Sequence, residues 1–365
     1  MKILFLHWGK SGAGPELLHE VFEAGLRAQV LVFASANLMS ERRKLFDATN
    51  NVHFVKTYSS RLTFVLNSFR VITNGLSLRK FIVSEGITHV FSIMESPYQS
   101  LALPIWKGRE VWYGSIIHDA EHHEGERGLI PRVTRSLEYI FADVVIGLSD
   151  AQSNLLRQLT KKPVVRMQLP ITGQKSPLPL VVKPKNSLVK ILFFGRLQAY
   201  KGIEELLHAV SILKEAGIEN FQVEIVGQGP VSCLASSRLG NLVRWNVGWV
   251  PDDQITNILS DADVVVLPYQ NGSQSGVVTI CQKLHIPMVI TPVSGLIEQV
   301  EKSGGALVCE DKSSQGIAKA LQAVVEDRNI LETLRNELAR SHQSLYWAED
   351  WAADLTALAT FLQEN

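Results

Sequence analysis

The sequence has few cysteines, no net charge and no long apolar run. Its 365 residues include 3 cysteines without metal-ligand spacing, too few for a disulfide scaffold, so a reducing, cytoplasmic location is predicted. Basic and acidic residues both number 36, and no nucleic-acid partner is expected. No apolar run reaches the roughly 18 residues of a membrane span. The apolar start, residues 1–6, is too short for a signal peptide and is predicted to be a strand.

Complete phosphate-binding motifs are also absent. Gly9-Lys10-Ser11 resembles the end of a phosphate loop, but Leu4 stands where GxxxxGK[ST] requires glycine. Gly12-Ala13-Gly14 does not complete GxGxxG, because Leu17 occupies the third glycine position. What remains is a glycine-rich loop before a helix. It predicts either backbone amides that bind an anion, with Gly12 and Gly14 as candidates, or a plain tight turn.

What is present is a regular alternation of strand-like apolar runs and helical stripes. This alternation predicts an α/β fold with doubly wound parallel sheets. Residues 172–187, rich in Pro, Lys and Ser, interrupt the alternation, and Lys190–Phe193 then repeats the sequence of Lys2–Phe5. We therefore predict two Rossmann-like domains that face each other across a cleft. The predicted segments are domain 1–172, linker 173–187, domain 188–343 and a final helix within 344–365.

The second domain opens with a strand that ends beside two basic residues. Val189–Phe194 is an apolar run typical of a buried parallel strand, and a helix is expected from about Gly202. Arg196 and Lys201 lie in the loop between them, where α/β proteins bind ligands. Two cations near a helix amino terminus suit a diphosphate. The alternative is that both are solvated loop charges.

Residues 118–126 contain three histidines and four acidic residues directly after a predicted strand. No HxH or HExxH spacing is present, so an active-site loop is predicted here in preference to a metal site. His118 comes first after the strand and is best placed to contact a ligand. Asp119, Glu121 and His122 are candidates for the acceptor side.

Basic residues are concentrated in the first half, where residues 1–180 carry 21 Lys+Arg against 15 Asp+Glu. Residues 61–81 combine apolar positions with basic ones, which is typical of a helix on an anionic membrane. A helix that packs on the core with a solvated basic edge fits equally. Peripheral contact with the inner face of the cell membrane is therefore a hypothesis.

Over residues 190–300 an ordered series of motifs resembles glycosyltransferase family 4, retaining enzymes with the GT-B fold. The motifs are GRLQAYKG, VGQGP, GWVPDDQI, ADVVVLPY and IPMVITPVSGLIEQV. The amino-terminal half matches only in outline, through the glycine loop and His118-Asp119. The resemblance implies that the final helix crosses back to the amino-terminal domain; a surface amphipathic helix would have the same periodicity.

The resemblance also implies roles for individual residues. A nucleotide-diphosphate sugar, with UDP or GDP left open, would be the co-substrate, without a cofactor or metal. Arg196 and Lys201 would neutralise its diphosphate, and His118 would hydrogen-bond the sugar near the reacting carbon. The acceptor would be a glycan hydroxyl, with a lipid-linked glycan favoured. Further donor-binding positions are Gly12, Gly14, Gly195, Gly227, Val250, Gln274, Ser275, Gly276 and Glu298.

One departure from the family concerns its paired glutamates, E-x7-E. Gly272 and Ile280 stand at these positions, so both carboxylates are missing. The variant loop Ser273–Gly276 is similar to that of a subset of bacterial polysaccharide transferases. The resemblance therefore predicts a polysaccharide-type glycosyltransferase, with a non-catalytic homologue that binds a partner or glycan as the alternative.

Overall fold

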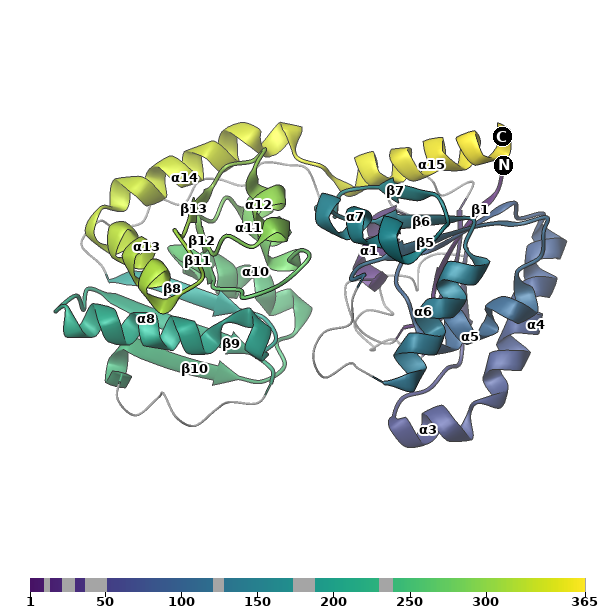
Figure 1. Ribbon diagram of the computed structural model, residues 1–365, viewed down its shortest axis with the longest axis horizontal. Coiled ribbons are helices and arrows are strands. Elements are labelled where there is room, and N and C mark those ends of the chain that lie inside the picture. Colours follow the sequence, from purple (N-terminus) through teal and green to yellow (C-terminus); the bar gives the residue numbers. More distant parts are fainter. Residues whose placement is uncertain are drawn as a thin grey trace. The chain divides into compact units, whose positions relative to one another are not determined.

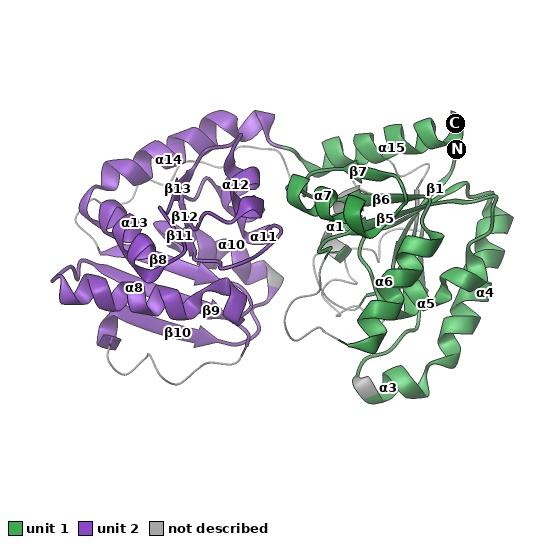
Figure 2. Ribbon diagram, viewed as in Figure 1, with its two compact units in different colours: residues 1–173, 346–365 green, residues 174–345 purple. Residues whose placement is uncertain are grey.

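The structure is a computed structural model that describes residues 1–9, 14–21, 30–36, 51–120, 128–172, 188–229 and 239–364. The chain divides into two compact units (Figure 2). Unit 1 comprises Met1–Gly173 with Tyr346–Asn365, and unit 2 comprises Gln174–Leu345. The predicted linker, residues 173–187, lies outside the described residues.

The described part of unit 1 contains a parallel sheet with strand order β3-β2-β1-β4-β5-β6-β7. Figure 1 labels β1, β5, β6 and β7 of this sheet. The order reverses between β1 and β4, as in a doubly wound Rossmann sheet. All five residues of β1 are buried, which is usual for a parallel strand covered by helices on both faces. The strands are β1 (Ile3–His7), β2 (Val30–Ser35), β3 (Val52–Val55), β4 (His89–Ser92), β5 (Trp112–Ile117), β6 (Val144–Gly147) and β7 (Val164–Arg166).

Helices of unit 1 connect and cover these strands. The segment predicted as one amphipathic helix over 61–81 is in fact two helices, separated at Asn67 and Ser68. Ser60 begins the first of them with a capping box to Thr63. The described helices are α1 (Gly14–Val21), α3 (Arg61–Leu66), α4 (Phe69–Glu85), α5 (Pro97–Trp106), α6 (Leu129–Phe141), α7 (Asp150–Leu159) and α15 (Ala348–Glu364).

The carboxyl-terminal helix α15 belongs to unit 1 (Figure 2). The chain returns beside the point where it left, because the Ile171 amide donates to Tyr346 O (2.9 Å) and the Ala348 amide donates to Ile171 O (3.1 Å). Trp351 and Leu355 of α15 are buried in the same core cluster as Phe5 of β1. The helix therefore supplies part of the hydrophobic core of unit 1.

Unit 2 repeats the same topology in its described part, with strand order β10-β9-β8-β11-β12-β13. Its reversal of order lies between β8 and β11. The strands are β8 (Val189–Phe194), β9 (Phe221–Gly227), β10 (Val243–Val247), β11 (Val264–Leu267), β12 (Met288–Ile290) and β13 (Ala306–Val308). The described helices are α8 (Ile203–Glu215), α10 (Asp252–Asp261), α11 (Gly276–Leu284), α12 (Ser294–Val300), α13 (Ser314–Glu326) and α14 (Arg328–Ser341).

Candidate functional site

The loops after β8 and β11 flank the point where the strand order of unit 2 reverses. Ligands of open α/β sheets bind at such a point, outside the carboxyl ends of the strands. Arg196 and Lys201 lie in the first loop, and residues 268–275 form the second. The two loops are joined by a hydrogen bond from the Gln270 amide to Tyr200 O (2.8 Å).

Glycines allow the loops after β8 and β9 to run in close contact. A Cβ on Gly227 would lie 1.7 Å from Gly195 O, and a Cβ on Gly229 would lie 2.3 Å from Leu197 O. The Leu197 amide donates to Gln228 O (2.9 Å), which continues the pairing of the two strands beyond their ends. Gly195 and Gly227, predicted as donor contacts, thus have a structural role in holding the Arg196 loop in place.

Lys201 lies over the ring of a buried tyrosine. Its Nζ is 3.6 Å from the ring centroid of Tyr269, within the range of a cation–π contact. The Tyr269 hydroxyl is hydrogen-bonded to Ser275 Oγ (3.0 Å). Burial raises the pKa of Tyr269, while the nearby charge of Arg196 opposes that rise. Lys201 therefore lies against a buried aromatic side chain that the sequence analysis did not single out.

The predicted role of the Ser275 amide needs correction. We expected this amide to bind a donor phosphate or sugar, but it donates to Gln299 Oε1 (2.7 Å), and Gln299 Nε2 donates to Ser275 O (3.1 Å). Ser275 Oγ also accepts from the Val277 amide and caps α11. Ser275 is therefore a residue that fixes the loop. Gly276 is exposed at the first position of α11, and Gln274 Oε1 is buried without a hydrogen-bond partner.

The other predicted donor contacts of unit 2 lie near the same sheet edge or on helix α12. Val250 is half-buried and packs on the core after β10. Glu298 is half-buried in α12. Gly295, at the start of α12, allows contact with the variant loop, because a Cβ there would lie 2.0 Å from Ser273 O. That glycine therefore has a packing role, which the sequence analysis did not predict although it quoted the residue in a motif.

In unit 1, His118 follows β5 as predicted. Its Nε2 is 3.0 Å from Ile93 O, the carbonyl that follows β4, so Nε2–H is the donor. Asp119 comes next, and its backbone carbonyl accepts from Arg135 Nη1 (2.7 Å). Glu121 and His122, the other acceptor-side candidates, lie outside the described residues, as does Gly12.

Gly14, predicted as an anion-binding position, makes room for a histidine. A Cβ on Gly14 would lie 2.7 Å from His7 Cε1, and a Cβ on Gly9 would lie 2.6 Å from the same atom. The His7 side chain is completely buried. The glycines on both sides of the loop therefore make room for His7, and the contact of Gly14 with the donor stays a prediction.

Metal-ligating side chains do not cluster in the described part of the chain. No group of three or more His, Cys, Asp or Glu there is arranged to hold an ion. Asp261 forms an ion pair with Lys190 Nζ (2.7 Å), and Asp263 Oδ2 accepts from the Lys190 amide (2.8 Å). These two aspartates, which resemble a DxD motif, therefore tie α10 and β11 to β8.

A buried carboxyl group lies behind the His118 turn. Glu138 of α6 accepts hydrogen bonds from Ser100 Oγ (2.5 Å), Tyr113 Oη (2.6 Å) and Ser115 Oγ (2.9 Å). Burial, and next the charge of Glu95, raise the pKa of Glu138 to about 7. The three hydroxyl donors oppose this rise without cancelling it.

Glu138 predicts a pH dependence of stability. The folded protein keeps a proton up to about pH 7 that the unfolded chain releases near pH 4.5. Stability should therefore fall as pH rises through this window, by up to about 1.4 kcal/mol per pH unit, and then level off. Urea unfolding of the parent and of Glu138→Gln at pH 5, 6, 7 and 8 measures this slope. The variant should have a shallower slope, and equal slopes in both proteins would assign the effect to other groups.

A comparison with protein families decides the nature of unit 2. Residues 189–327 match the model of the family described as glycosyl transferases group 1. Unit 2 carries a group 1 glycosyl transferase domain. The resemblance read from the motifs of residues 190–300 is thereby confirmed for this transferase domain, which contains Arg196, Lys201 and the variant loop.

Curated relatives are similar over part of the chain. The putative colanic acid biosynthesis glycosyltransferase WcaL of Escherichia coli is 27% identical over 214 residues, covering 54% of this chain and 52% of the relative. The putative teichuronic acid biosynthesis glycosyltransferase TuaC of Bacillus subtilis is 32% identical over 130 residues, covering 36% of this chain and 31% of the relative. The matched segments thus span about half and about a third of these relatives.

Solved structures resemble the whole chain. Anabaena HepE in complex with UDP and glucose has a TM-score of 0.73 at 16% identity, covering 98% of this chain and 99% of HepE. Sucrose-phosphate synthase from Thermosynechococcus elongatus has a TM-score of 0.74 at 17% identity, covering 100% and 99%. The prediction of a GT-B fold with two Rossmann-like domains, of which the transferase domain is the second, is confirmed.

Proposed function

We propose that this protein is a retaining glycosyltransferase that moves a sugar from a nucleotide-diphosphate donor to a glycan hydroxyl in polysaccharide synthesis. The observation that carries the proposal is the placement of Arg196, and of Lys201 over buried Tyr269, in the loop at the reversal of strand order in a transferase domain. Relatives named for colanic and teichuronic acid biosynthesis support the polysaccharide class. HepE, with UDP and glucose, supports a nucleotide-sugar donor.

In the proposed reaction, the bond between the sugar carbon and the phosphate oxygen breaks while a bond to the acceptor oxygen forms. The acceptor attacks from the face of the leaving group, and the departing phosphate takes the acceptor proton. Arg196 and Lys201 stabilise the negative charge that develops on the diphosphate, so no metal is required. His118 hydrogen-bonds the donor sugar through the imidazole edge that is not used for Ile93 O.

A panel of nucleotide sugars tests the proposal. We expect donor hydrolysis or transfer with one UDP- or GDP-sugar, unchanged by a chelator. Activity that disappears with the chelator and returns with magnesium or manganese would contradict the metal-free mechanism. Glycan binding without turnover of any donor would favour the alternative, a non-catalytic homologue, which the missing glutamates at Gly272 and Ile280 support.

The variant loop is proposed to contact the donor sugar through Gln274. Its Oε1 is buried and has no hydrogen-bond partner, and Gly276 beside it is exposed at the start of a helix. Gln274→Ala should reduce transfer by about tenfold while nucleoside diphosphate affinity changes less, because the amide would contact the sugar. Gly276→Val should lower both sugar transfer and nucleoside diphosphate affinity. If both variants transfer sugar at the rate of the parent, the loop only connects β11 to α11 and does not contact the donor.

Peripheral membrane contact is proposed for helices α3 and α4. Leu62, Leu66 and Phe69 are each more than half exposed, and Arg79 and Lys80 follow in α4. Exposed apolar side chains next to basic ones suit an anionic bilayer surface. None of the described helices has both the length and the apolar character needed to cross a membrane. The proposed contact is through the exposed surface of α3 and α4, and it would hold the enzyme near a lipid-linked acceptor.

Replacing both Leu62 and Phe69 with serine should lower binding to anionic vesicles by at least about tenfold, since full burial of each apolar side chain contributes about 1.5–3 kcal/mol and about 1.4 kcal/mol is tenfold. Co-sedimentation at low and high salt is the measurement. Leu159→Ser in α7 is the matched control, because Leu159 is also exposed but lies on another helix. Equal losses in the control and the double variant would contradict a specific surface.

A further inference from the structure

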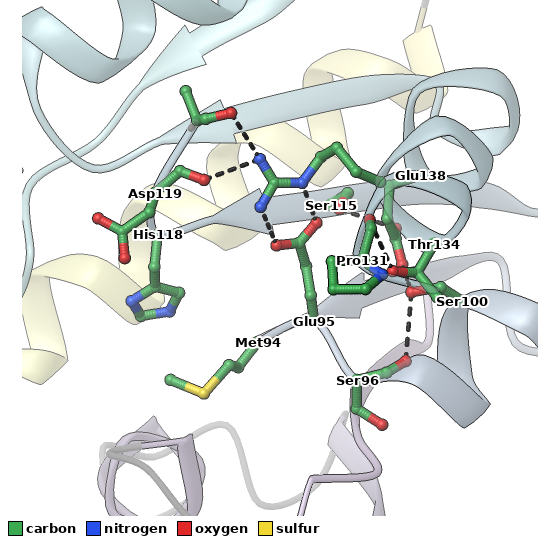
Figure 3. A network of polar contacts seen from close by, with 12 residues as sticks. Met94, Glu95, Ser96, Ser100, Ser115, His118, Asp119, Pro131, Thr134 and Glu138 are labelled. Atoms are coloured by element: carbon green, nitrogen blue, oxygen red, sulfur yellow. Dashed lines mark hydrogen bonds and ion pairs between the residues drawn. The ribbon is translucent and has the colours of Figure 1, made fainter. Parts of the chain in front are cut away.

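Arg135 of α6 connects the His118 turn to the neighbouring strand end. Its Nε and Nη2 donate to the two carboxylate oxygens of Glu95 (2.7 and 2.6 Å), and its Nη1 donates to the carbonyls of Asp119 (2.7 Å) and Ala120 (2.8 Å). Figure 3 shows Glu95, His118 and Asp119 together at this network. A planar guanidinium makes such a bidentate pair with a fixed geometry, which a lysine cannot reproduce.

The network contacts the backbone that follows His118 and the strand end whose carbonyl binds its ring. Arg135 holds Asp119 and Ala120, the two residues after the histidine, while Gln152 Oε1 accepts from the Ala120 amide (2.6 Å). On the other side, Glu95 lies two residues after Ile93, whose carbonyl accepts from His118 Nε2. The Arg135–Glu95 pair therefore joins the segment that carries His118 to the segment that sets the orientation and tautomer of its ring.

A second ion pair offers an internal comparison. Lys107 and Asp143 lie 3.0 Å apart, with side-chain exposures of 9% and 27%, against 10% and 24% for Arg135 and Glu95. Asp143 accepts from the Tyr113 amide, near the amino end of β5, whereas Arg135 acts after its carboxyl end. The two pairs are similarly buried, and both hydrogen-bond backbone of β5 or of the segment directly after it. Of the two, the Arg135–Glu95 pair contacts the segment that carries His118.

We infer that Arg135 and Glu95 are positioning residues for sugar transfer, which hold His118 in the orientation that the donor sugar requires. This inference rests on the proposed function of His118. Neither residue contacts the reacting atoms. Their loss should therefore lower kcat, since a displacement of about 1 Å at a reacting group costs up to about 100-fold. Nucleoside diphosphate affinity should be kept, because the cations assigned to the diphosphate belong to unit 2.

The test compares Arg135→Met, Arg135→Lys and Glu95→Gln with the control Lys107→Met, all in the full chain. Transfer kinetics give kcat, calorimetry gives UDP and GDP affinity, and thermal unfolding gives stability. We expect both Arg135 variants and Glu95→Gln to lower kcat by 10- to 100-fold with less than a twofold change in nucleotide affinity. Lys107→Met should lower the melting temperature about as much as Arg135→Met does. Its kcat should stay within about threefold of that of the parent.

Nitrogen NMR of the His118 imidazole provides a measurement that does not depend on turnover. The parent and Lys107→Met should show the Nε2–H tautomer, and Arg135→Met should show a mixture. Equal kcat losses in Arg135→Met and Lys107→Met, or an unchanged tautomer in Arg135→Met, would overturn the inference. A parent without transfer activity, but with the expected tautomer difference, would refute the proposed function and leave the positioning of His118 standing.

Discussion

Alanine in place of Lys201 is expected to lower sugar transfer by about 100- to 1,000-fold. Loss of one preordered charge at a developing negative charge typically has this effect. Lys201 is held over Tyr269 at 3.6 Å, so its ammonium is placed before the donor binds. Nucleoside diphosphate affinity should fall as well, because the same charge contacts the diphosphate in the ground state. Initial rates at saturating donor, together with calorimetric affinities, measure both effects.

Arg196→Ala should cause a loss of the same size, and Lys201→Arg should retain more activity than Lys201→Ala because it keeps the charge. Lys214→Ala, in the last turn of α8, is the control for the removal of a positive charge from unit 2. Near-normal turnover in Lys201→Ala or Arg196→Ala would end the assignment of these side chains to the leaving group.

Gly202→Ala should be among the most destabilising single substitutions in the transferase domain. A Cβ there would lie 1.8 Å from Pro268 O, and the residue has a φ of +72°. Backbone strain and overpacking together should lower the free energy of unfolding by about 2–5 kcal/mol. Because Gly202 is the N-cap of α8 and directly follows Lys201, nucleotide binding should also weaken in the protein that remains folded.

Gly217 provides the matched control for this experiment. It has a φ of +75° after the end of α8, but a Cβ at this position would have no neighbour within 4 Å. Gly217→Ala should therefore lower the free energy of unfolding only by the backbone strain, about 1–2 kcal/mol. Denaturant unfolding of both variants isolates the cost of the steric clash. Similar losses in the two would show that the contact between Gly202 and Pro268 is easily relaxed.

The order of apolar runs was sufficient to predict the α/β class, the repeated domain and several element bounds. The strand Val189–Phe194 has the predicted limits, and the helix expected from about Gly202 begins at Ile203. Buried parallel strands have this local signature because both of their faces are covered. The site cations Arg196 and Lys201 could be proposed for a related reason: their place after a strand follows from the chain alone.

Tertiary structure decided what those loop residues contact. Nothing local in the sequence indicates that Gly14 makes room for His7, that Gln299 binds both backbone groups of Ser275, or that Arg135 reaches Glu95. Each contact joins residues from different strands or helices, and side-chain periodicity reports only which face of an element is buried. The sequence by itself therefore determined the fold class and the place of Arg196 and Lys201 after a strand end. The partners that fix His118, Ser275 and Lys201 depend on which strand ends become neighbours when the sheets form.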